Sequence, residues 1–259
     1  MHPLLLHTDH RPFPPPRGPW IMKQDWHDLL FAHWEIPVEQ LKPLIPVELD
    51  LDLFQGRAYV AVAPFHMTGI HARMFPALPG LSRFPELNVR TYVRCQHMPG
   101  VFFFSLDAAN LPAVWSARVS YGLPYFYAEM SAKITGEDVE YRSRRRSSFS
   151  KRNSLPAEFR GSYRPITEPK RREKDSLEGF LTERYCLYAI RRGKLVRAHI
   201  HHLPWPLQDA EAEIEINTMV KAAGIELPRT KPLLHFSRFL EVLVWTPERV
   251  GTSVHRYIG

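Results

Sequence analysis

Strand-like segments follow one another along most of this chain, and the helical segments between them are few and short. The expected strands are rich in β-branched and aromatic residues and are bounded by Gly and Pro. They cover Gly56–Phe65, Glu86–Cys95, Gly100–Ala108, Tyr125–Ile134, Tyr185–Arg192, Lys194–Leu203 and Leu233–Trp245. Because no strand–helix–strand rhythm is present, a doubly wound parallel sheet is not expected. The pattern predicts a mainly β protein of the α+β kind, an antiparallel sheet or closed barrel with a few short helices.

The expected helices and turns have recognisable ends. Leu111–Tyr121 is amphipathic, and Gly122 follows it as a residue that commonly ends helices. The strands on either side of His97–Gly100 are close enough in sequence to form a hairpin. Two further short helices are expected, at Val38–Leu44 and after Asp175 or Ser176.

The size and hydrophobicity of the chain favour one domain. With 259 residues, 44% of them hydrophobic, the chain can bury a sizeable core, which we place at residues 21–250. Residues 1–20 contain HRPFPPPRGPW, and this proline density predicts an extended, flexible arm. Residues 251–259 are expected to form a C-terminal tail. No apolar run approaches the roughly 20 residues that cross a bilayer, and Met1–Leu6 is too short for a signal-peptide core, so we expect a cytoplasmic protein without a membrane partner.

The net charge of +7 is concentrated in one segment. Residues 142–174 carry 12 Lys or Arg against 3 Asp or Glu, and the rest of the chain has 22 basic and 24 acidic residues. Aromatic residues are interleaved here at Phe149, Phe159 and Tyr163, as in grooves that bind single-stranded nucleic acid. No motif of a known nucleic-acid-binding module accompanies them. A solvated basic hairpin is therefore expected, with anion or nucleic-acid binding as the less favoured alternative.

Seven ordered sequence blocks carry a family resemblance. Over about Trp26–Trp245 the chain resembles the YqjF-like family of uncharacterised bacterial proteins, and more distantly acetoacetate decarboxylase. This resemblance implies an acetoacetate-decarboxylase-like β barrel or cone that encloses a small-molecule cavity. The blocks are DLLFAHWEIP, FPELNVRTYV, FFFSLDA, ARVSYGLPY, LTERYCLY, IHHLPWPLQ and LLHFSRFLEV.

The resemblance also shows what this chain lacks. In the decarboxylases a Gly-aromatic-Pro-Lys-Lys sequence carries the lysine that forms a Schiff base with substrate. The matching block here is Gly122-Leu123-Pro124-Tyr125-Phe126, with an aromatic residue at each lysine position. A phenol cannot form an imine with a ketone, and it acts as a hydrogen-bond donor near neutral pH. Lys133 cannot replace the missing amine, because eight strand residues carry it roughly 26 Å beyond Tyr125.

A polar face on the strand Glu86–Cys95 is the main candidate site. The resemblance places Glu86, in the Phe-Pro-Glu block, at the position of the decarboxylases' cavity glutamate. Glu86, Asn88, Arg90 and Tyr92 alternate with other residues, so they share one face of the strand. Inside a barrel this face would bind a polar acid. A solvent-facing strand or a structural Arg–Glu network is the alternative.

Further candidates have weaker support. Arg118 and Tyr121 stand just before the Gly-Leu-Pro turn, and His33 and His235 lie beside aromatic residues in the family blocks, where buried histidines with structural roles are common. The cluster His199, His201 and His202 lacks a third ligand with metal-site spacing, so neither metal nor cofactor is expected. Cys95 and Cys186 are expected to be buried free thiols.

Two functional hypotheses remain open from the sequence. The first is a cavity for a small organic acid, in which Glu86 and Tyr125 act as acid and base in a lyase, hydratase or isomerase reaction on a keto acid. The second is a non-catalytic ligand-binding or scaffold protein that kept the fold without the chemistry. The sequence leaves the oligomeric state open, a homo-oligomer included.

The replacement of lysine by Tyr125 gives a chemical prediction. Reduction with borohydride in the presence of acetoacetate or pyruvate should trap no stoichiometric adduct at this site, because no amine stands there to form an imine. Intact-protein mass spectrometry followed by peptide mapping would make the measurement. A reduced adduct on a lysine of the cavity would contradict it.

Overall fold

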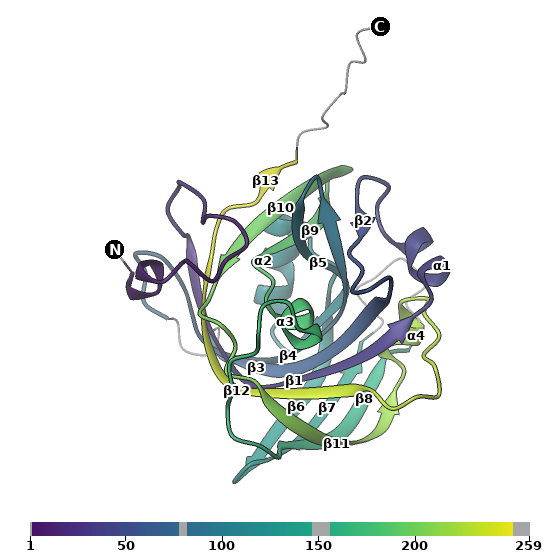
Figure 1. Ribbon diagram of the computed structural model, residues 1–259. Coiled ribbons are helices and arrows are strands. Elements are labelled where there is room, and N and C mark those ends of the chain that lie inside the picture. Colours follow the sequence, from purple (N-terminus) through teal and green to yellow (C-terminus); the bar gives the residue numbers. More distant parts are fainter. Residues whose placement is uncertain (1, 78–81, 147–155, 251–259) are drawn as a thin grey trace, which may run out of the picture.

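Thirteen strands dominate the part of the chain that the computed structural model describes, residues 2–77, 82–146 and 156–250 (Figure 1). The strands are β1 Met22–Ile36, β2 Asp50–Leu51, β3 Ala58–Ala72, β4 Phe84–Cys95, β5 Met98–Ala108, β6 Tyr125–Thr135, β7 Asp138–Arg145, β8 Glu158–Pro165, β9 Cys186–Arg191, β10 Lys194–His201, β11 Gln208–Asn217, β12 Leu233–Val244 and β13 Glu248–Arg249. The helices are α1 Val38–Leu41, α2 Leu111–Tyr121, α3 Leu177–Thr182 and α4 Met219–Ala222, with 3-10 turns η1 Pro3–Leu6 and η2 Lys42–Leu44. The mainly β class is confirmed.

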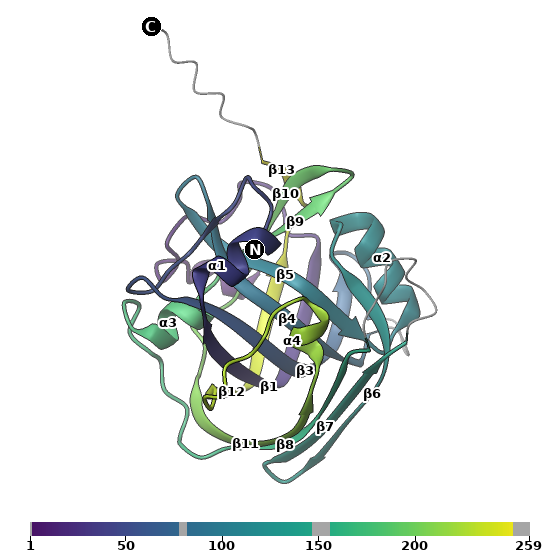
Figure 2. The same ribbon diagram turned by 90° about the vertical axis from the view of Figure 1, so that its right-hand side faces the viewer.

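The sheet closes on itself twice. A seven-stranded ring of described residues runs β5–β4–β3–β1–β12–β10–β9 and returns to β5. A second, nine-stranded ring shares the strands from β12 to β5 and is completed by β6, β7, β8 and β11 (Figure 2). Most pairings are antiparallel, as predicted, but β5 pairs in parallel with both β6 and β9. Closure protects most strand edges from pairing with other chains.

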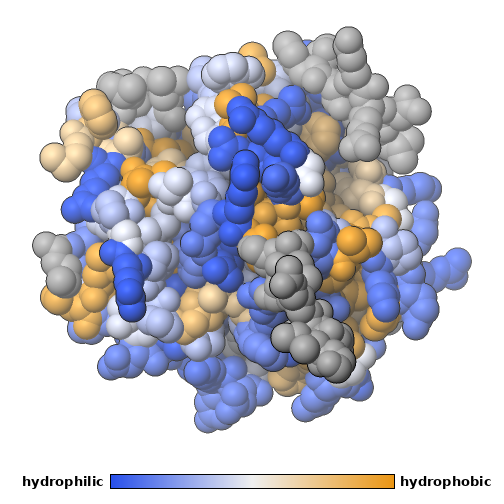
Figure 3. All heavy atoms as spheres, turned by 90° about the horizontal axis from the view of Figure 1, so that it is seen from above, coloured by the Kyte–Doolittle hydropathy of each residue, from blue (hydrophilic) through white to orange (hydrophobic). Residues whose placement is uncertain are grey.

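The two rings differ in what fills them. Buried apolar side chains pack the nine-stranded ring, among them Leu87, Val89, Tyr141, Phe159 and Phe236. The seven-stranded ring instead surrounds a cavity. Seen from above, the surface of the molecule mixes hydrophilic and hydrophobic residues, with hydrophobic ones gathered near the middle of this face (Figure 3). None of the helices in the described residues is long and apolar enough to span a membrane.

Strand β4 belongs to both rings, and its side chains point alternately into the interior of one ring and of the other. Leu87 and Val89 enter the apolar core of the nine-stranded ring, whereas Glu86, Asn88 and Arg90 point into the cavity of the seven-stranded ring. All five side chains are buried. The alternative of a solvent-facing strand is therefore wrong.

Two long strands were not expected from the sequence. The second half of β1 is buried on both faces, so it shows no polar alternation, and a register shift interrupts its pairing with β3 between His27 and Ala32. Strand β11 does alternate, with Glu211, Glu213 and Glu215 on its exposed face. That period of two was the signal that could have identified β11, although Glu and Ala are poor strand formers.

The proline-rich N-terminal segment differs from the flexible arm that its composition predicts. Leu4 is buried, and the Arg11 guanidinium is buried as well, with Nη1 donating to the Ile200 carbonyl at 2.7 Å. Arg11 also lies over the Tyr185 ring, and His10 bonds to the His202 carbonyl at 2.9 Å. The prolines keep this segment out of the sheet, but its side chains still pack against it. The predicted tail, residues 251–259, lies outside the described residues.

The two arginines of β8 in the basic segment are paired with glutamates of the neighbouring strand. Arg160 pairs with Glu215 and Arg164 with Glu211 across the β8–β11 pairing. Phe159 and Tyr163 are buried in the core, so neither can stack on a nucleic-acid base. Phe149 lies outside the described residues. The β7–β8 hairpin is present as predicted, and its charge pairing weakens the nucleic-acid alternative.

The chain between β5 and β6 is held by specific local features. Asn110 caps helix α2 by accepting from the Ala113 amide at 3.0 Å, and Gly122 ends it with φ of 72°. A Cβ on Gly122 would lie 2.8 Å from the Ile190 carbonyl oxygen, so the close approach of β9 also requires glycine. The chain then enters β6, where Tyr125 pairs with Leu106 in parallel register.

A buried ion pair fixes β5 against β7. The Arg145 Nη2 atom lies 2.6 Å from Oδ1 of Asp107, Nε lies 2.9 Å from Oδ2, and both side chains are buried. The guanidinium carbon lies 3.9 Å from the centroid of the Phe126 ring. This bidentate pair therefore clamps the start of β6 beside β5.

Removing one partner of this pair should destabilise the fold. Asp107→Ala leaves the Arg145 charge buried without its carboxylate, and we expect the free energy of unfolding to fall by about 3–5 kcal/mol in urea denaturation. Asp138→Ala is the control, because that exposed carboxylate lies at 3.9 Å from Arg164 and should contribute less than about 0.5 kcal/mol. Equal losses in the two variants would show that the buried pair does not hold this region together.

Candidate functional site

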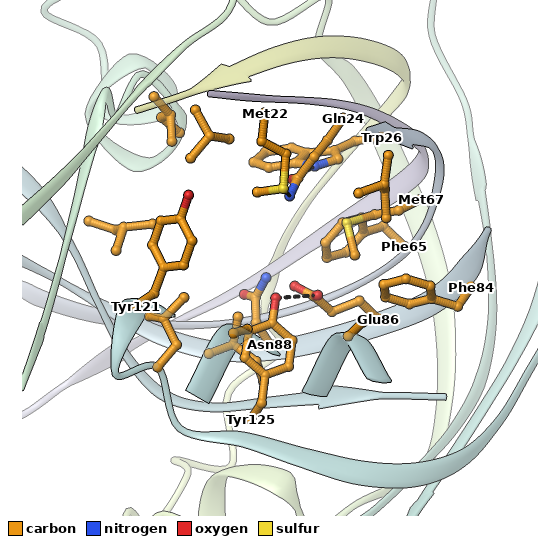
Figure 4. Close-up of a pocket in the computed structure, with 18 of the residues that line it drawn as sticks. Met22, Gln24, Trp26, Phe65, Met67, Phe84, Glu86, Asn88, Tyr121 and Tyr125 are labelled. Carbon is orange, nitrogen blue, oxygen red and sulfur yellow. Dashed lines mark hydrogen bonds between the residues drawn. The ribbon is translucent and has the colours of Figure 1, made fainter. Parts of the chain in front are cut away.

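The seven-stranded ring encloses a cavity of about 530 Å³. All seven strands contribute side chains to it, and helix α2 lines it with Ala113, Ser116 and Ala117. Figure 4 shows the arrangement: Met22, Gln24 and Trp26 of β1 lie on one side, and Glu86, Asn88 and Tyr125 lie on the other. The volume falls in the range of pockets that hold organic ligands.

Glu86 and Tyr125 form the polar centre of this cavity. The Tyr125 hydroxyl donates to Oε2 of Glu86 at 2.7 Å (Figure 4). Of the partners open to Glu86 from the sequence, Tyr125, Arg90 or Arg118, the structure pairs it with Tyr125. This hydrogen bond follows from the sheet, because Glu86 of β4 pairs with Ala108 of β5, and Leu106 of β5 pairs with Tyr125 of β6.

Burial keeps both groups of this pair protonated. Desolvation raises the pKa of Glu86 to about 8, and the hydrogen bond from Tyr125 opposes this shift only in part. Desolvation and the neighbouring Glu86 carboxyl raise the pKa of Tyr125 well above 10. At neutral pH the pair is therefore mainly a carboxylic acid beside a phenol, two neutral groups that can polarise or protonate a carbonyl oxygen.

The cationic end of the cavity is built around Arg90. This side chain is buried, and its Nε and Nη2 atoms have no hydrogen-bond partner among the described residues. Arg184 also lines the cavity; its Nη1 atom donates to Oδ2 of Asp52 at 2.5 Å, a carboxylate that Arg94 shares, and its Nη2 atom has no partner among the described residues. The Oδ1 atom of Asn88 also lacks a partner within the described structure. Buried polar atoms left unpaired are costly, so a ligand that pairs them gains binding energy.

Apolar side chains make the remaining walls. Phe84, Phe65 and Met67 lie beyond Glu86, and the Trp26 ring is 5.6 Å from that of Phe65 (Figure 4). The Trp26 Nε1 atom donates to Gln24 Oε1 at 2.9 Å, which satisfies the one polar atom of the indole. This region of the cavity therefore presents an apolar surface to a ligand.

The structure separates the remaining predicted residues into two groups. Tyr121 lines the cavity together with Glu86, Asn88, Arg90 and Tyr125. Arg118, His33 and His235 do not line it. The Arg118 Nε atom donates to the Tyr125 carbonyl at 2.5 Å, and His33 bonds to the Tyr92 hydroxyl at 2.6 Å. Both therefore support the residues around the site rather than face the cavity.

The two histidines of β10 and His202, which follows it, each make separate contacts. His199 lies 3.3 Å from Glu248, and His201 donates to the Leu4 carbonyl at 2.9 Å. His202 stacks on Tyr185 and reaches the cavity wall. Within the described residues no group of three His, Cys, Asp or Glu side chains is arranged to hold a metal ion. Cys95 and Cys186 are free and buried, as predicted.

Sequence reasoning missed several cavity residues, namely Arg184, Gln24, Trp26, Trp205 and His202. They come from β1, from the segment before β9 and from the segment after β10, and only barrel closure brings them to one cavity. No lysine is among the described residues that line it. Lys133 is exposed and lies 3.9 Å from Glu140 on the neighbouring strand.

Residues 23–241 match a family described as uncharacterized conserved proteins, the domain of unknown function 2071. The chain belongs to this family. It is 48% identical over 230 residues to the uncharacterized protein YqjF of Bacillus subtilis, covering 89% of this chain and 93% of that protein. The family resemblance of the sequence blocks is therefore confirmed.

Solved structures show the same fold at low sequence identity. Acetoacetate decarboxylase from Legionella pneumophila superposes with a TM-score of 0.61 at 12% identity, over 93% of each chain. The enduracididine biosynthesis enzyme MppR, complexed with pyruvate, gives 0.61 at 8% identity, over 90% of this chain and 91% of that one. The acetoacetate-decarboxylase-like fold of this family member is therefore established.

The raised pKa of Glu86 gives a test of its environment. An unfolded glutamate loses its proton near pH 4.5 and the folded one near pH 8, so the stability that the protonated form provides is lost as pH rises between these values. Glu86→Gln mimics the protonated acid at every pH. Above pH 8 we expect this variant to have a higher melting temperature than the wild type and a free energy of unfolding greater by on the order of a few kcal/mol. Both differences should shrink toward pH 5.

Differential scanning calorimetry from pH 5 to pH 9 measures this effect. Glu213→Gln changes an exposed carboxylate on β11 and should leave the pH dependence as in the wild type. A difference between Glu86→Gln and the wild type that stays constant across this range would show that Glu86 is not desolvated in solution.

Proposed function

We propose that this protein binds a small organic acid in the cavity of the seven-stranded ring, with the carboxylate of the ligand held by Arg90. The observation that carries the proposal is the buried guanidinium whose Nε and Nη2 atoms lack a protein partner among the described residues. A carboxylate is the partner that matches a planar guanidinium with two parallel hydrogen bonds. The free cavity volume of about 530 Å³ gives the acid room to enter.

Glu86 and Tyr125 supply general acid–base chemistry in this proposal. With Tyr125 donating to Oε2, a protonated Glu86 carries its proton on the other carboxyl oxygen and can donate it to a carbonyl or hydroxyl oxygen of the ligand. A pKa near 8 lets the same group release and regain a proton close to neutral pH. This chemistry suits a lyase, hydratase or isomerase.

Schiff-base decarboxylation is not part of the proposed function. The described cavity wall offers Tyr125 and no amine, and an imine requires a primary amine. A solved structure of the relative MppR contains pyruvate, a carboxylic acid. This supports the proposal of an acid-binding cavity. In this proposal the protein shares with that relative the binding of a carboxylic acid, not a covalent step.

The alternative, a non-catalytic scaffold, predicts a cavity closed by aromatic side chains. The open cavity and the unpaired Arg90 favour ligand binding instead. A protein that binds the acid without transforming it remains the second hypothesis. Exchange of the protons beside a bound ketone for solvent deuterium, followed by NMR, separates the two, because only acid–base chemistry exchanges them.

Hexanoate and hexanamide test the role of Arg90, since they share one hydrocarbon chain and end in a charged carboxylate or in a neutral amide. Isothermal titration calorimetry should show that the wild type binds hexanoate at least about tenfold more tightly than hexanamide, and that Arg90→Met removes this preference. Unliganded Arg90→Met should melt at the same or a higher temperature, because the variant no longer buries an unpaired charge.

Arg57→Met is the matched control, because Arg57 is exposed and pairs with Glu35 on the surface. It should bind both compounds like the wild type. Equal binding of hexanoate by Arg90→Met and the wild type would refute the assignment of the carboxylate to Arg90.

A further inference from the structure

The polar groups of the cavity are arranged in a fixed order along β4. Phe84, Glu86, Asn88 and Arg90 all line the cavity. Successive members of this series are two residues apart, or about 6.6 Å along an extended strand. About 13 Å of strand therefore separates the backbone of Glu86 from that of Arg90.

The Arg90 guanidinium lies against two aromatic rings. Its guanidinium carbon lies 5.1 Å from the ring centroid of Phe31 and 5.9 Å from that of Tyr92, the residue two positions farther along β4. Its Nε and Nη2 atoms have no partner among the described residues, so they do not bond to Glu86. Glu86 is itself held toward Tyr125 of β6 by their hydrogen bond. The cation and the acid pair thus occupy two distinct places in the cavity.

A short keto acid cannot reach both places. In a 3-oxo acid the carbonyl carbon is two carbon–carbon bonds, about 2.5 Å, from the carboxylate carbon. A group that bonds to Arg90 would then leave Glu86 and Tyr125 without a ligand oxygen. Bridging the cavity requires about three or more carbon atoms between the carboxylate carbon and the carbonyl carbon.

The end of the cavity beyond Glu86, where Phe84 lies, is apolar. Phe84, Phe65 and Met67 continue the cavity past Glu86, where Trp26 closes one side (Figure 4). Methionine adapts its shape to different apolar groups, and aromatic rings bury a large area. This end therefore favours a hydrocarbon portion of the ligand.

We infer that the ligand is an elongated carboxylic acid whose carbonyl or hydroxyl group lies several carbons from its carboxylate and is followed by an apolar portion. This inference rests on the proposed function. The carboxylate pairs with Arg90, the remote oxygen bonds to the Glu86–Tyr125 pair, and a hydrogen-bond donor between them can satisfy Oδ1 of Asn88. The apolar portion lies against Phe84 and Met67.

Two isomers of one keto acid test this order of groups. Calorimetric titration should show that 5-oxohexanoate binds at least about tenfold more tightly than 2-oxohexanoate or hexanoate, because only its oxygen reaches Glu86. Glu86→Leu should make 5-oxohexanoate and hexanoate bind equally, whereas Arg90→Met should weaken both alike. The comparison of isomers on the wild type stands even if Glu86→Leu does not fold.

Chain extension tests the apolar end. Each methylene added beyond the keto group, from 5-oxohexanoate toward 5-oxodecanoate, should tighten binding about fourfold until the cavity is full. Met67→Trp fills this end and should remove the gain while leaving 5-oxohexanoate bound. Met74→Trp is the control, because Met74 is exposed and not part of the cavity wall, and it should keep the gain.

The outcomes separate the two proposals. Equal binding of hexanoate and hexanamide would overturn the proposed function itself. Preferential binding of hexanoate, together with 2-oxohexanoate binding as tightly as 5-oxohexanoate, would keep the acid-binding cavity and overturn the elongated ligand. An affinity that does not change with added methylenes would overturn the apolar portion.

Discussion

Strand β4 is shared by two closed rings, so every side chain on it must suit one of two interiors. The interior of the nine-stranded ring takes Leu87 and Val89 into a packed apolar core, which stabilises the fold. The interior of the seven-stranded ring receives Glu86, Asn88 and Arg90, whose polar atoms only a ligand or solvent can fully satisfy. A shift of one residue in the register of β4 would exchange the two sets and bury three polar groups in the core. The register that packs Leu87 and Val89 into the core therefore also determines which β4 side chains line the cavity.

The placement of Tyr125 depends on how the chain leaves β5. Gly122 ends helix α2 where β9 passes too close for a side chain, and β6 then starts in parallel beside β5. The Asp107–Arg145 pair holds the Phe126 ring against the Arg145 guanidinium. Because neighbouring residues of a strand point to opposite faces, Tyr125 then faces the cavity. The decarboxylases that this family resembles place their lysine at the matching position of the sequence. In the proposed function, Tyr125 at this geometrically fixed point offers a hydrogen-bonding phenol where the sequence resemblance implies an amine, within the same barrel fold.

The sequence predicts those features of the site that depend on residues close together in the chain. Alternation along Glu86–Cys95 was sufficient to predict which side chains share a face, and the family resemblance paired Glu86 with Tyr125. Closure of the barrel, which joins strands far apart in sequence, was not readable from periodicity. This is why Arg184 and Trp26 were missed and why His33 and His235, which lie in similar blocks, were placed with the ligand-binding residues. Composition also described the proline-rich N-terminus without showing that Arg11 docks on β10.

The central claim is that Arg90 of β4 and the neutral pair of Glu86 on β4 and Tyr125 on β6 contact two separate groups of one ligand. A crystal structure of the protein soaked with 5-oxohexanoate tests this claim most directly. The account predicts that the carboxylate lies within hydrogen-bond distance of the Nε or Nη2 atom of Arg90 and that the keto oxygen lies within reach of Glu86 or Tyr125. A carboxylate bound at the Glu86 end, or a ligand found only outside the seven-stranded ring, would contradict it.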